Sequence, residues 1–368
     1  WRIDPLTFLV GKNGAGKSTL LDAVEFLREA VTDNLRTATA RRGSAMAIRR
    51  RGAHPDAPVG IAVVLRADLA RGRESRILWG FEFTGSVSQF REVLLVSPED
   101  SLGFMRRGRD VTSERLPAGS QLDTSALALA HFFGEEALWG AVENTVRQMR
   151  TYALDPHQIA LGGRPGAATN LLSDGSNAAD LLLDHLNRKS AVETATNRTL
   201  SAILGAPTEL NVGIQGGRIG LAADITEGKD APRRYDGSEL SSGTLRAIGT
   251  LLALGQTPEP SFLLIDELEE SLHPHAVAIL LEIAAEASAR HPVVVTSHSP
   301  ELLKQPAVSA DNVRVVTWER GTARLHRLDA ATRETIDTRL DDVGNLLSIN
   351  ALWPAEAAET FDGDILAL

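Results

Sequence analysis

Residues 11–18 have the types and spacing of a loop that binds phosphate groups. They read Gly-Lys-Asn-Gly-Ala-Gly-Lys-Ser, after an apolar run and before residues with helical spacing. Glycines let backbone N–H groups curl around phosphate oxygens, Lys17 supplies a positive charge, and the Ser18 hydroxyl is a ligand for Mg²⁺. The N-terminus of the following helix adds partial positive charge at the same place. The segment predicts a nucleoside triphosphate site, whose expected contacts are Asn13, Gly14, Ala15, Gly16, Lys17, Ser18 and Thr19.

A pair of acids follows an apolar strand far along the chain. Phe262–Ile265 is a continuous apolar run, and Asp266 and Glu267 come directly after it. The carboxyl ends of parallel strands meet at one edge of a sheet, where ligands bind. There Asp266 can hold Mg²⁺, directly or through water, and Glu267 can orient and polarise an attacking water. The alternative is that these acids cap the next helix, a role we expect for Glu269 and Glu270.

Three further motifs carry a family resemblance. Leu240–Arg246 reads Leu-Ser-Ser-Gly-Thr-Leu-Arg, Ser271–Pro274 reads Ser-Leu-His-Pro, and Thr296–Ser299 reads Thr-Ser-His-Ser. In order and spacing they resemble the signature, the D-loop and the switch-histidine region of ABC-type P-loop ATPases. The resemblance covers nearly the whole chain and is greatest to the RecF, SMC and OLD-like branch, especially its stand-alone bacterial ATPases. The long stretch between the phosphate loop and the acids is typical of that branch and exceeds what a transporter domain needs.

The resemblance implies a role for each motif. In such proteins two subunits sandwich two ATP molecules, and each phosphate loop faces the signature of the other subunit. This implies a head-to-tail homodimer that binds ATP and Mg²⁺, with the partner's γ-phosphate contacted by Ser241, Ser242 and Gly243. Ser271 is expected to connect the two sites, and His298 to sense the γ-phosphate beside the base Glu267. For His298 the alternative is an ordinary surface histidine, and His273 is expected to be structural.

The Q-loop glutamine is less well defined than the other motifs. It should lie between the β-rich and helical parts of the chain. Gln158, which follows Asp155-Pro156, is the best-placed candidate, and Gln121 and Gln148 are alternatives.

The pattern of apolar residues predicts an α/β fold of the ABC-ATPase head type. We expect a mainly parallel sheet around the phosphate loop, an antiparallel β-meander and a helical insertion lobe. The predicted strands of the parallel sheet are residues 6–10, 151–154, 262–265, 293–296 and 313–318. The meander is predicted from residue 59 to about 115, helices at 125–150, 177–187 and 191–204, and a hairpin at 209–225. The predicted domains are an N-terminal ATPase lobe (1–124), a helical insertion lobe (125–207) and a C-terminal ATPase lobe (208–368).

The composition is that of an ordinary globular protein. Of 368 residues, 43% are apolar and 23% are charged, and the absence of cysteine excludes disulfides, thiolate metal sites and cysteine nucleophiles. No apolar stretch is long enough to cross a membrane, and no secretion signal opens the chain. We therefore expect a cytoplasmic protein that does not contact a membrane. Because the chain begins at Trp1 and enters a strand almost at once, we also expect some N-terminal sequence to be missing.

The net charge of −10 restricts any nucleic-acid contact to local patches. Two arginine clusters are candidates for contacts with DNA or RNA phosphates, one formed by Arg41, Arg42 and residues 49–51, the other by Arg106, Arg107 and Arg109. Neither contains interleaved aromatic residues, so the stacking pattern of single-strand binders is absent. Solvated loops are the alternative interpretation.

Two functions from different classes fit these features. In the first, ATP-driven dimer closure gates a DNA-maintenance or repair process. In the second, the chain is the sensor or regulatory ATPase of an anti-phage defence or toxin system and acts with a separate effector protein. OLD-like relatives often carry a TOPRIM nuclease domain after the ATPase. Only about 50 residues follow Trp318, too few for such a domain, so we expect no intrinsic nuclease activity.

Overall fold

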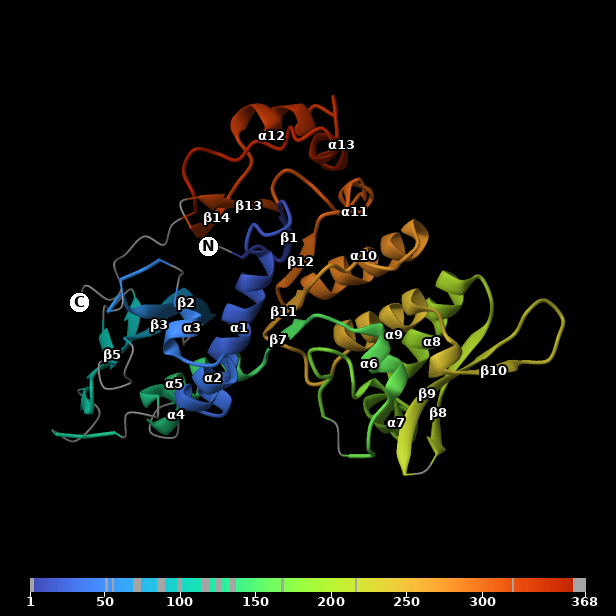
Figure 1. The fold of residues 1–368 in the computed structure, drawn as a ribbon, viewed down its shortest axis with the longest axis horizontal. Helices are drawn as coiled ribbons and strands as arrows, with labels where there is room; N and C mark the ends of the chain where they lie inside the picture. Colours follow the sequence, from blue (N-terminus) through green and yellow to red (C-terminus); the bar gives the residue numbers. More distant parts are fainter. Residues whose placement is uncertain are drawn as a thin grey trace. The chain divides into compact units, whose positions relative to one another are not determined.

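The described part of the chain forms two compact units in the computed structural model (Figure 1). The first consists of Trp1–Leu21, Arg150–Trp318 and Ala323–Glu359, and the second of Asp22–Met149, Glu319–Thr322 and Thr360–Leu368. Within them the structure describes residues 3–49, 52–54, 56–68, 74–84, 90–97, 101–113, 119–122, 127–132, 137–166, 169–215, 217–319 and 321–359. The division into three lobes at residues 124 and 207 stays a prediction.

A six-stranded sheet with the order β14-β13-β1-β12-β11-β7 is the centre of the first unit. Strand β1 pairs in parallel with both β12 and β13, and β11 pairs in parallel with β12. The strands are β1 (Leu6–Val10), β7 (Met149–Tyr152), β11 (Phe262–Ile265), β12 (Val293–Ser297), β13 (Val313–Glu319) and β14 (Thr322–His326). Every residue of β1, β11 and β12 is buried, which explains their continuous apolar runs. The predicted mainly parallel sheet is confirmed.

Two long helices of the first unit pack together beside this sheet. Helix α9 (Ser242–Leu254) contacts α10 (Pro274–Ser288), and α10 contacts β12. Figure 1 shows α10 running alongside the strands β11 and β12. All residues of α9 from Thr244 onward are buried, so this helix lies in the core. Its first N–H groups have no partner within the helix and need a capping side chain. Ser241 is this cap, because its side chain accepts a hydrogen bond from the Thr244 N–H.

A smaller antiparallel sheet with its own helices completes this part of the unit. The predicted hairpin is confirmed as β8 (Thr208–Gln215) and β9 (Arg218–Ile225), and an unpredicted strand, β10 (Arg233–Asp236), pairs with β9. The accompanying helices are α6 (Pro156–Leu161), α7 (Ala178–Arg188), α8 (Ala191–Leu204) and the 3₁₀ turn η1 (Gly237–Glu239).

The C-terminal part of the first unit adds more than the sequence predicted. We expected the last core strand at 313–318, but β14 follows it and forms the edge of the main sheet. The remaining helices are α11 (Pro300–Leu303), α12 (Ala330–Asp337) and α13 (Val343–Ser348).

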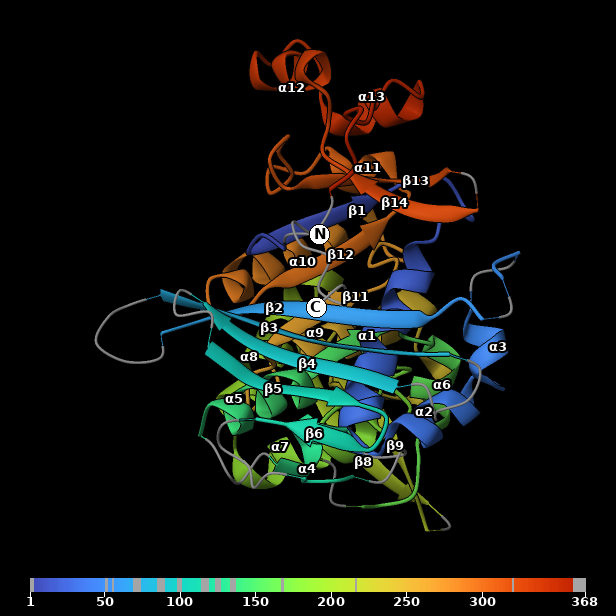
Figure 2. The same cartoon turned by 90° about the vertical axis from the view of Figure 1, so that its left-hand side faces the viewer.

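The second unit contains the predicted antiparallel meander, whose strands lie side by side in Figure 2. Its order is β2-β3-β4-β5-β6, formed by Val59–Asp68, Glu74–Phe83, Phe90–Ser97, Ser101–Arg107 and Asp110–Thr112. The unit also holds most of α1 (Lys17–Thr32), with α2 (Leu35–Arg41), α3 (Ala45–Ile48), α4 (Ala128–Phe132) and α5 (Ala137–Arg147). Buried aromatic side chains fill one face of the meander, and Phe81 stacks on Phe83 and Phe90.

A buried carboxylate fixes α4 to the meander. The Glu92 side chain accepts hydrogen bonds from Trp79 Nε1 at 3.0 Å and from the N–H groups of Ala128 and Leu129 at 2.6 and 3.1 Å. The guanidinium of Arg106, itself fully buried, lies 3.9 Å away. Burial raises the pKa of Glu92, and all four of these interactions oppose that shift. Without Glu92, the Trp79 indole and two buried backbone N–H groups would lose this acceptor.

We expect Glu92→Ala to lower the free energy of unfolding by roughly 3 kcal/mol, because three buried donors lose the carboxylate that accepts their hydrogen bonds. Chemical denaturation followed by tryptophan fluorescence measures this. The matched control is Glu82→Ala on the neighbouring strand, whose carboxylate pairs at 3.3 Å with Arg91, which is 57% exposed. We expect a cost of about 1 kcal/mol or less there. Equal losses in the two variants would contradict the assigned role of Glu92.

Candidate phosphate-binding site

The phosphate loop lies between β1 and α1, as the sequence predicts. Gly14 and Gly16 have φ values of 80° and 104°, which residues with a Cβ rarely adopt. A Cβ on Gly11 would lie 2.5 Å from the Val316 carbonyl oxygen, so this position also excludes a side chain. Ser18 and Thr19 are exposed at the start of the helix. The backbone therefore has the open, glycine-dependent form that exposes N–H groups to an anion.

Lys17 is the buried cation of the site. Its side chain is 6% exposed, and Nζ donates to the carbonyl oxygens of Gly11 at 2.7 Å and Lys12 at 3.4 Å. Burial lowers the pKa of Lys17, and the charges of Glu267, Asp266 and Glu269 oppose that shift. These acids come from a part of the sequence far from the phosphate loop. The fold thus brings the two predicted motifs into one electrostatic cluster.

Thr296, at the end of β12, holds the acidic pair in place. Its hydroxyl donates to Asp266 Oδ1 and accepts from the Glu267 N–H at 2.9 Å. Glu267 has a φ of 46°, a left-handed conformation that costs a residue with a side chain about 1–2 kcal/mol. Such strain at a functional position persists only when neighbouring bonds impose it. Thr296 is therefore a positioning residue that sequence analysis quoted only as part of the histidine motif.

Glu269 holds the loop that carries His298. Its Oε1 atom accepts from Ser297 Oγ at 2.7 Å, the His298 N–H at 3.1 Å and the Ser299 N–H at 3.2 Å. The His298 ring approaches the acids, with Nδ1 3.5 Å from Glu267 Oε1 and 3.8 Å from Glu269 Oε1. The predicted switch histidine and the predicted base are thus adjacent.

The expectation that Glu269 and Glu270 cap the next helix is wrong. Helix α10 is capped instead by His273, whose Nδ1 accepts from the His275 N–H at 3.3 Å. This agrees with the structural role expected for His273. Glu269 instead accepts hydrogen bonds from three donors on the histidine loop, and Glu270 accepts one from a buried arginine.

That arginine, Arg246, links the signature helix to the acidic strand end. It is 4% exposed and donates to the carbonyl oxygens of Leu154 at 2.7 Å and Glu267 at 3.3 Å, and to Glu270 Oε2 at 2.6 Å. With Thr296 on its N–H and Arg246 on its carbonyl oxygen, the strained Glu267 backbone is bonded on both sides. Sequence analysis named Arg246 only as the last residue of the signature.

The predicted signature and D-loop residues are neighbours at the start of α9. Ser241 and Ser242 are exposed, although the helix behind them is buried. A Cβ on Gly243 would lie only 2.5 Å from the carbonyl oxygen of Ser271, which itself has a φ of 63°. Gly243 is thus required for the close approach of these two segments within one chain.

Of the three Q-loop candidates, only Gln158 belongs to the same unit as the phosphate loop. Gln158 lies half-buried in α6 and belongs to the same unit as the phosphate loop. Gln121 and Gln148 belong to the second unit, where Gln121 donates to Asp110 Oδ1 at 3.0 Å. Gln158 remains the prediction for this position.

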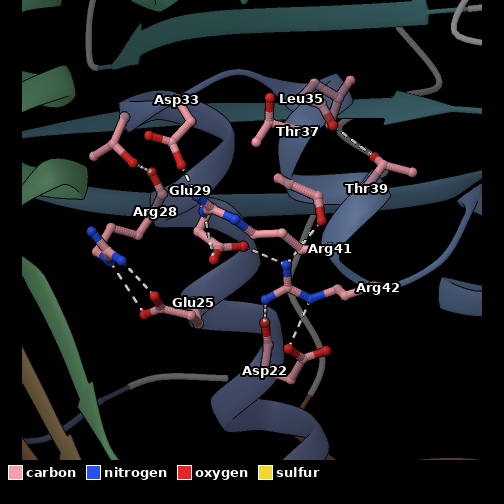
Figure 3. A network of polar contacts seen from close by, with 12 residues as sticks. Asp22, Glu25, Arg28, Glu29, Asp33, Leu35, Thr37, Thr39, Arg41 and Arg42 are labelled. Carbon is pink, nitrogen blue, oxygen red and sulfur yellow. Dashed lines mark hydrogen bonds and ion pairs between the residues drawn. The ribbon is translucent and has the colours of Figure 1, made fainter. Parts of the chain in front are cut away.

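Three of the arginines that are candidates for nucleic-acid contact lie beside acidic side chains of the same chain. Arg41 pairs with Glu29 and Asp33 at 2.9 and 2.6 Å, and Arg42 pairs with Glu29 and Asp22 at 2.5 and 2.8 Å (Figure 3). Arg106 is buried beside Glu92, so it cannot reach a phosphate backbone. Arg50 and Arg51 lie outside the described residues. These pairings weaken the case for nucleic-acid contact through the two clusters.

Two predicted oxygen donors fit a magnesium ion. Mg²⁺ in nucleotide sites is usually held by one or two protein oxygens together with phosphate oxygens. Ser18 presents an exposed hydroxyl, and Thr296 occupies one carboxylate oxygen of Asp266, which leaves the other available. Among the described residues no group of three or more His, Asp or Glu side chains forms a metal site. Ser18 and Asp266 therefore suit a Mg²⁺ ion whose remaining ligands are phosphate oxygens of the nucleotide and water.

The sheet order, the glycine loop and the acidic strand end define the class of P-loop ATPases with an ABC-type head. Residues 6–63 and 209–304 match the profile of a family described as "AAA domain, putative AbiEii toxin, Type IV TA system". The first matched segment holds the phosphate loop, and the second holds the acidic strand end and the histidine loop. No curated protein sequence shows significant similarity to the chain.

Solved structures of SMC heads are similar to this chain over most of its length. An SmcHead bound to the C-winged helix domain of ScpA has a TM-score of 0.54 at 13% identity, and the match covers 91% of this chain and 93% of that chain. An SMC head bound to the C-terminal domain of ScpA, derived from Pyrococcus furiosus, has a TM-score of 0.49 at 12% identity, with coverage of 92% and 94%. The SMC head domain from Thermotoga maritima has a TM-score of 0.45 at 15% identity, with coverage of 90% and 93%. The first of these supports an SMC-head-like fold. No helix in the described ranges is both long and apolar enough to span a membrane.

We expect Glu269→Ala to loosen the histidine loop, because the Ser297 hydroxyl and the His298 N–H lose their acceptor and the Ser299 N–H loses one of its two acceptors. Hydrogen exchange at Ser297–Ser299 should become roughly tenfold faster or more, since each lost hydrogen bond is worth about 1 kcal/mol. The matched control is Glu282→Ala on the exposed face of α10, which should leave exchange in this loop unchanged. Unchanged exchange in Glu269→Ala would show that the loop is held by other contacts.

Proposed function

We propose that this chain hydrolyses ATP at a site that only a homodimer completes. One observation carries the hydrolytic part, namely that β12 pairs in parallel with both β1 and β11, so that the phosphate loop with its buried Lys17 and the acids Asp266 and Glu267 lie at one edge of the sheet. In this proposal Lys17 and the loop N–H groups bind the β- and γ-phosphates, while Ser18 and Asp266 hold Mg²⁺, which neutralises phosphate charge when bound. Glu267 orients the attacking water and accepts its proton, and His298 beside it contacts the γ-phosphate.

The exposed signature supports the dimeric part of the proposal. Ser241 and Ser242 are exposed at the N-terminus of a 13-residue helix. A helix N-terminus favours negative charge, so this end suits a phosphate supplied by a second subunit. In a two-fold dimer the same contact occurs twice, and two ATP molecules are enclosed. Ser271, in contact range of the Gly243 backbone, would transmit closure from one site to the other.

Of the two cellular roles, we favour a regulatory ATPase of a toxin or defence system that acts with a separate effector protein. The family description names a toxin system, and three of the arginines available for DNA contact are already paired. The SMC-head-like fold supports the other role, an ATP-gated step in DNA maintenance or repair. An ATPase rate that rises with duplex DNA would favour DNA maintenance, and a rate that rises only with a co-purified effector would favour the regulatory role.

Glu267→Gln should separate ATP binding from hydrolysis. The amide keeps the shape of the side chain but cannot accept the proton, so turnover should fall by roughly 10²-fold or more while ATP remains bound. Phosphate release and equilibrium binding of ATP measure the two effects. Glu282→Ala on α10 is the control and should keep the wild-type rate. Unchanged turnover in Glu267→Gln would assign the base elsewhere.

Mixing two inactive variants tests the composite site. Gly243 is unsuitable for this purpose, because any side chain there would collide with the Ser271 backbone of the same chain. Ser242→Asp is suitable, since an acid in the first turn stabilises a helix yet repels a phosphate supplied by the partner. Ser242→Asp and Lys17→Ala should each be inactive alone. Their mixture should recover part of the wild-type rate, because one site of the mixed dimer is intact.

Sedimentation with Mg²⁺ and a non-hydrolysable ATP analogue gives a second measurement for the same pair. Wild-type protein should sediment as a dimer and Ser242→Asp as a monomer that still binds the analogue. A rate per subunit that is independent of concentration, in a protein that stays monomeric, would contradict the composite site.

A further inference from the structure

The hairpin formed by β13 and β14 packs directly against the phosphate loop. A Cβ on Gly11 would lie 2.5 Å from the carbonyl oxygen of Val316, and a Cβ on Gly16 would lie 2.6 Å from Cβ of Ala323. The same hypothetical Cβ on Gly16 would lie 3.9 Å from Cζ3 of Trp318. An indole ring therefore borders the last glycine of the loop.

Trp318 is exposed, although it projects from a firmly held strand. Its side chain is 58% exposed, whereas Val313–Val316 before it are buried. Hydrogen bonds hold the hairpin, because Thr317 Oγ1 contacts His326 Nε2 at 3.1 Å and His326 Nδ1 contacts the Ala355 carbonyl oxygen at 2.8 Å. A large apolar ring that a rigid element presents to solvent is a feature of ligand sites rather than of cores.

The order of the strands gives the direction in which a nucleotide would lie. The acids Asp266 and Glu267 follow β11, which is two strands from β1 on one side, while β13 is next to β1 on the other. With its γ-phosphate toward the acids and Lys17, a nucleotide extends from the phosphate loop toward the β13 side. The base end then reaches the edge of the loop where Trp318 lies.

We propose that Trp318 stacks on the base of the bound nucleoside triphosphate and contributes a base subsite to this loop. The inference rests on the proposed ATP-binding function and adds the residue that binds the base. Stacking on an aromatic ring uses the π-face that every base has, so this contact adds affinity with little discrimination among bases. A purine offers the larger face and should bind more tightly than a pyrimidine.

Comparison of ATP with inorganic tripolyphosphate isolates the base contact, because tripolyphosphate has the phosphates without a base. In the full chain with Mg²⁺, Trp318→Ala should weaken ATP binding by roughly 5- to 100-fold and leave tripolyphosphate binding unchanged. Trp318→Phe should restore most of the loss, since a phenyl ring also stacks. Trp353→Ala is the matched control, because Trp353 is 61% exposed but lies outside the hairpin, and it should change neither affinity.

Tryptophan fluorescence gives an independent measurement. ATP should change the emission of wild-type protein, tripolyphosphate should not, and Trp318→Phe should lose the ATP response while it still binds ATP. Equal weakening of both ligands in Trp318→Ala would assign Trp318 to the support of the loop and overturn the base subsite. Unchanged affinity for both, or loss of dimerisation alone, would also overturn it. If wild-type protein bound neither ligand, or if Lys17→Ala bound both normally, the proposed function itself would fail.

Discussion

The burial of one ammonium group is the constraint on which the first unit depends. Removing the Lys17 charge from water is costly, and two backbone carbonyl groups of its own loop accept hydrogen bonds from its ammonium group. Three carboxylates about 250 positions further along the sequence, Asp266, Glu267 and Glu269, supply negative charge that favours the charged form of Lys17. These acids can approach only because the parallel pairing of β1 with β12, and of β12 with β11, aligns the carboxyl ends of the strands. The sheet order is thus coupled to the electrostatics of the loop.

A second layer of side chains makes this arrangement rigid. Thr296 and Arg246 bond the N–H and the carbonyl oxygen of Glu267, whose left-handed backbone would otherwise relax. One carboxylate oxygen of Glu269 accepts hydrogen bonds from three donors of the histidine loop. None of these three residues needs to touch a nucleotide to matter. Each fixes the position of a residue that the sequence motifs name, so the geometry of the acids depends on side chains outside the minimal motifs.

The sequence predicted those parts that depend on local patterns. The loop at 11–18 and the strand before Asp266 were correctly located, because glycine spacing and a continuous apolar run determine local structure. Longer-range bonds were not predictable in this way. Glu269 lies 28 positions from Ser297, and Arg246 lies 92 positions from Leu154, so no spacing in the sequence connects them. The arginine pair at 41–42 was ambiguous for the same reason, because its acidic partners on α1 become neighbours only after folding (Figure 3).

The distribution of burial suggests why nucleotide and assembly should be coupled in this fold. Within one chain the cation, the acids and the histidine loop form a connected cluster, whereas Ser241 and Ser242 remain exposed. A ligand that bridges the cluster of one subunit and the exposed helix end of another would stabilise the proposed dimer, because it binds the closed pair more tightly than either subunit alone. Arg246 joins the two regions within each chain, since it extends from the signature helix to the Glu267 carbonyl oxygen. In the proposed dimer, movement of the signature on closure would therefore act on the strained backbone that carries the base, and hydrolysis would remove the bridging phosphate and favour reopening.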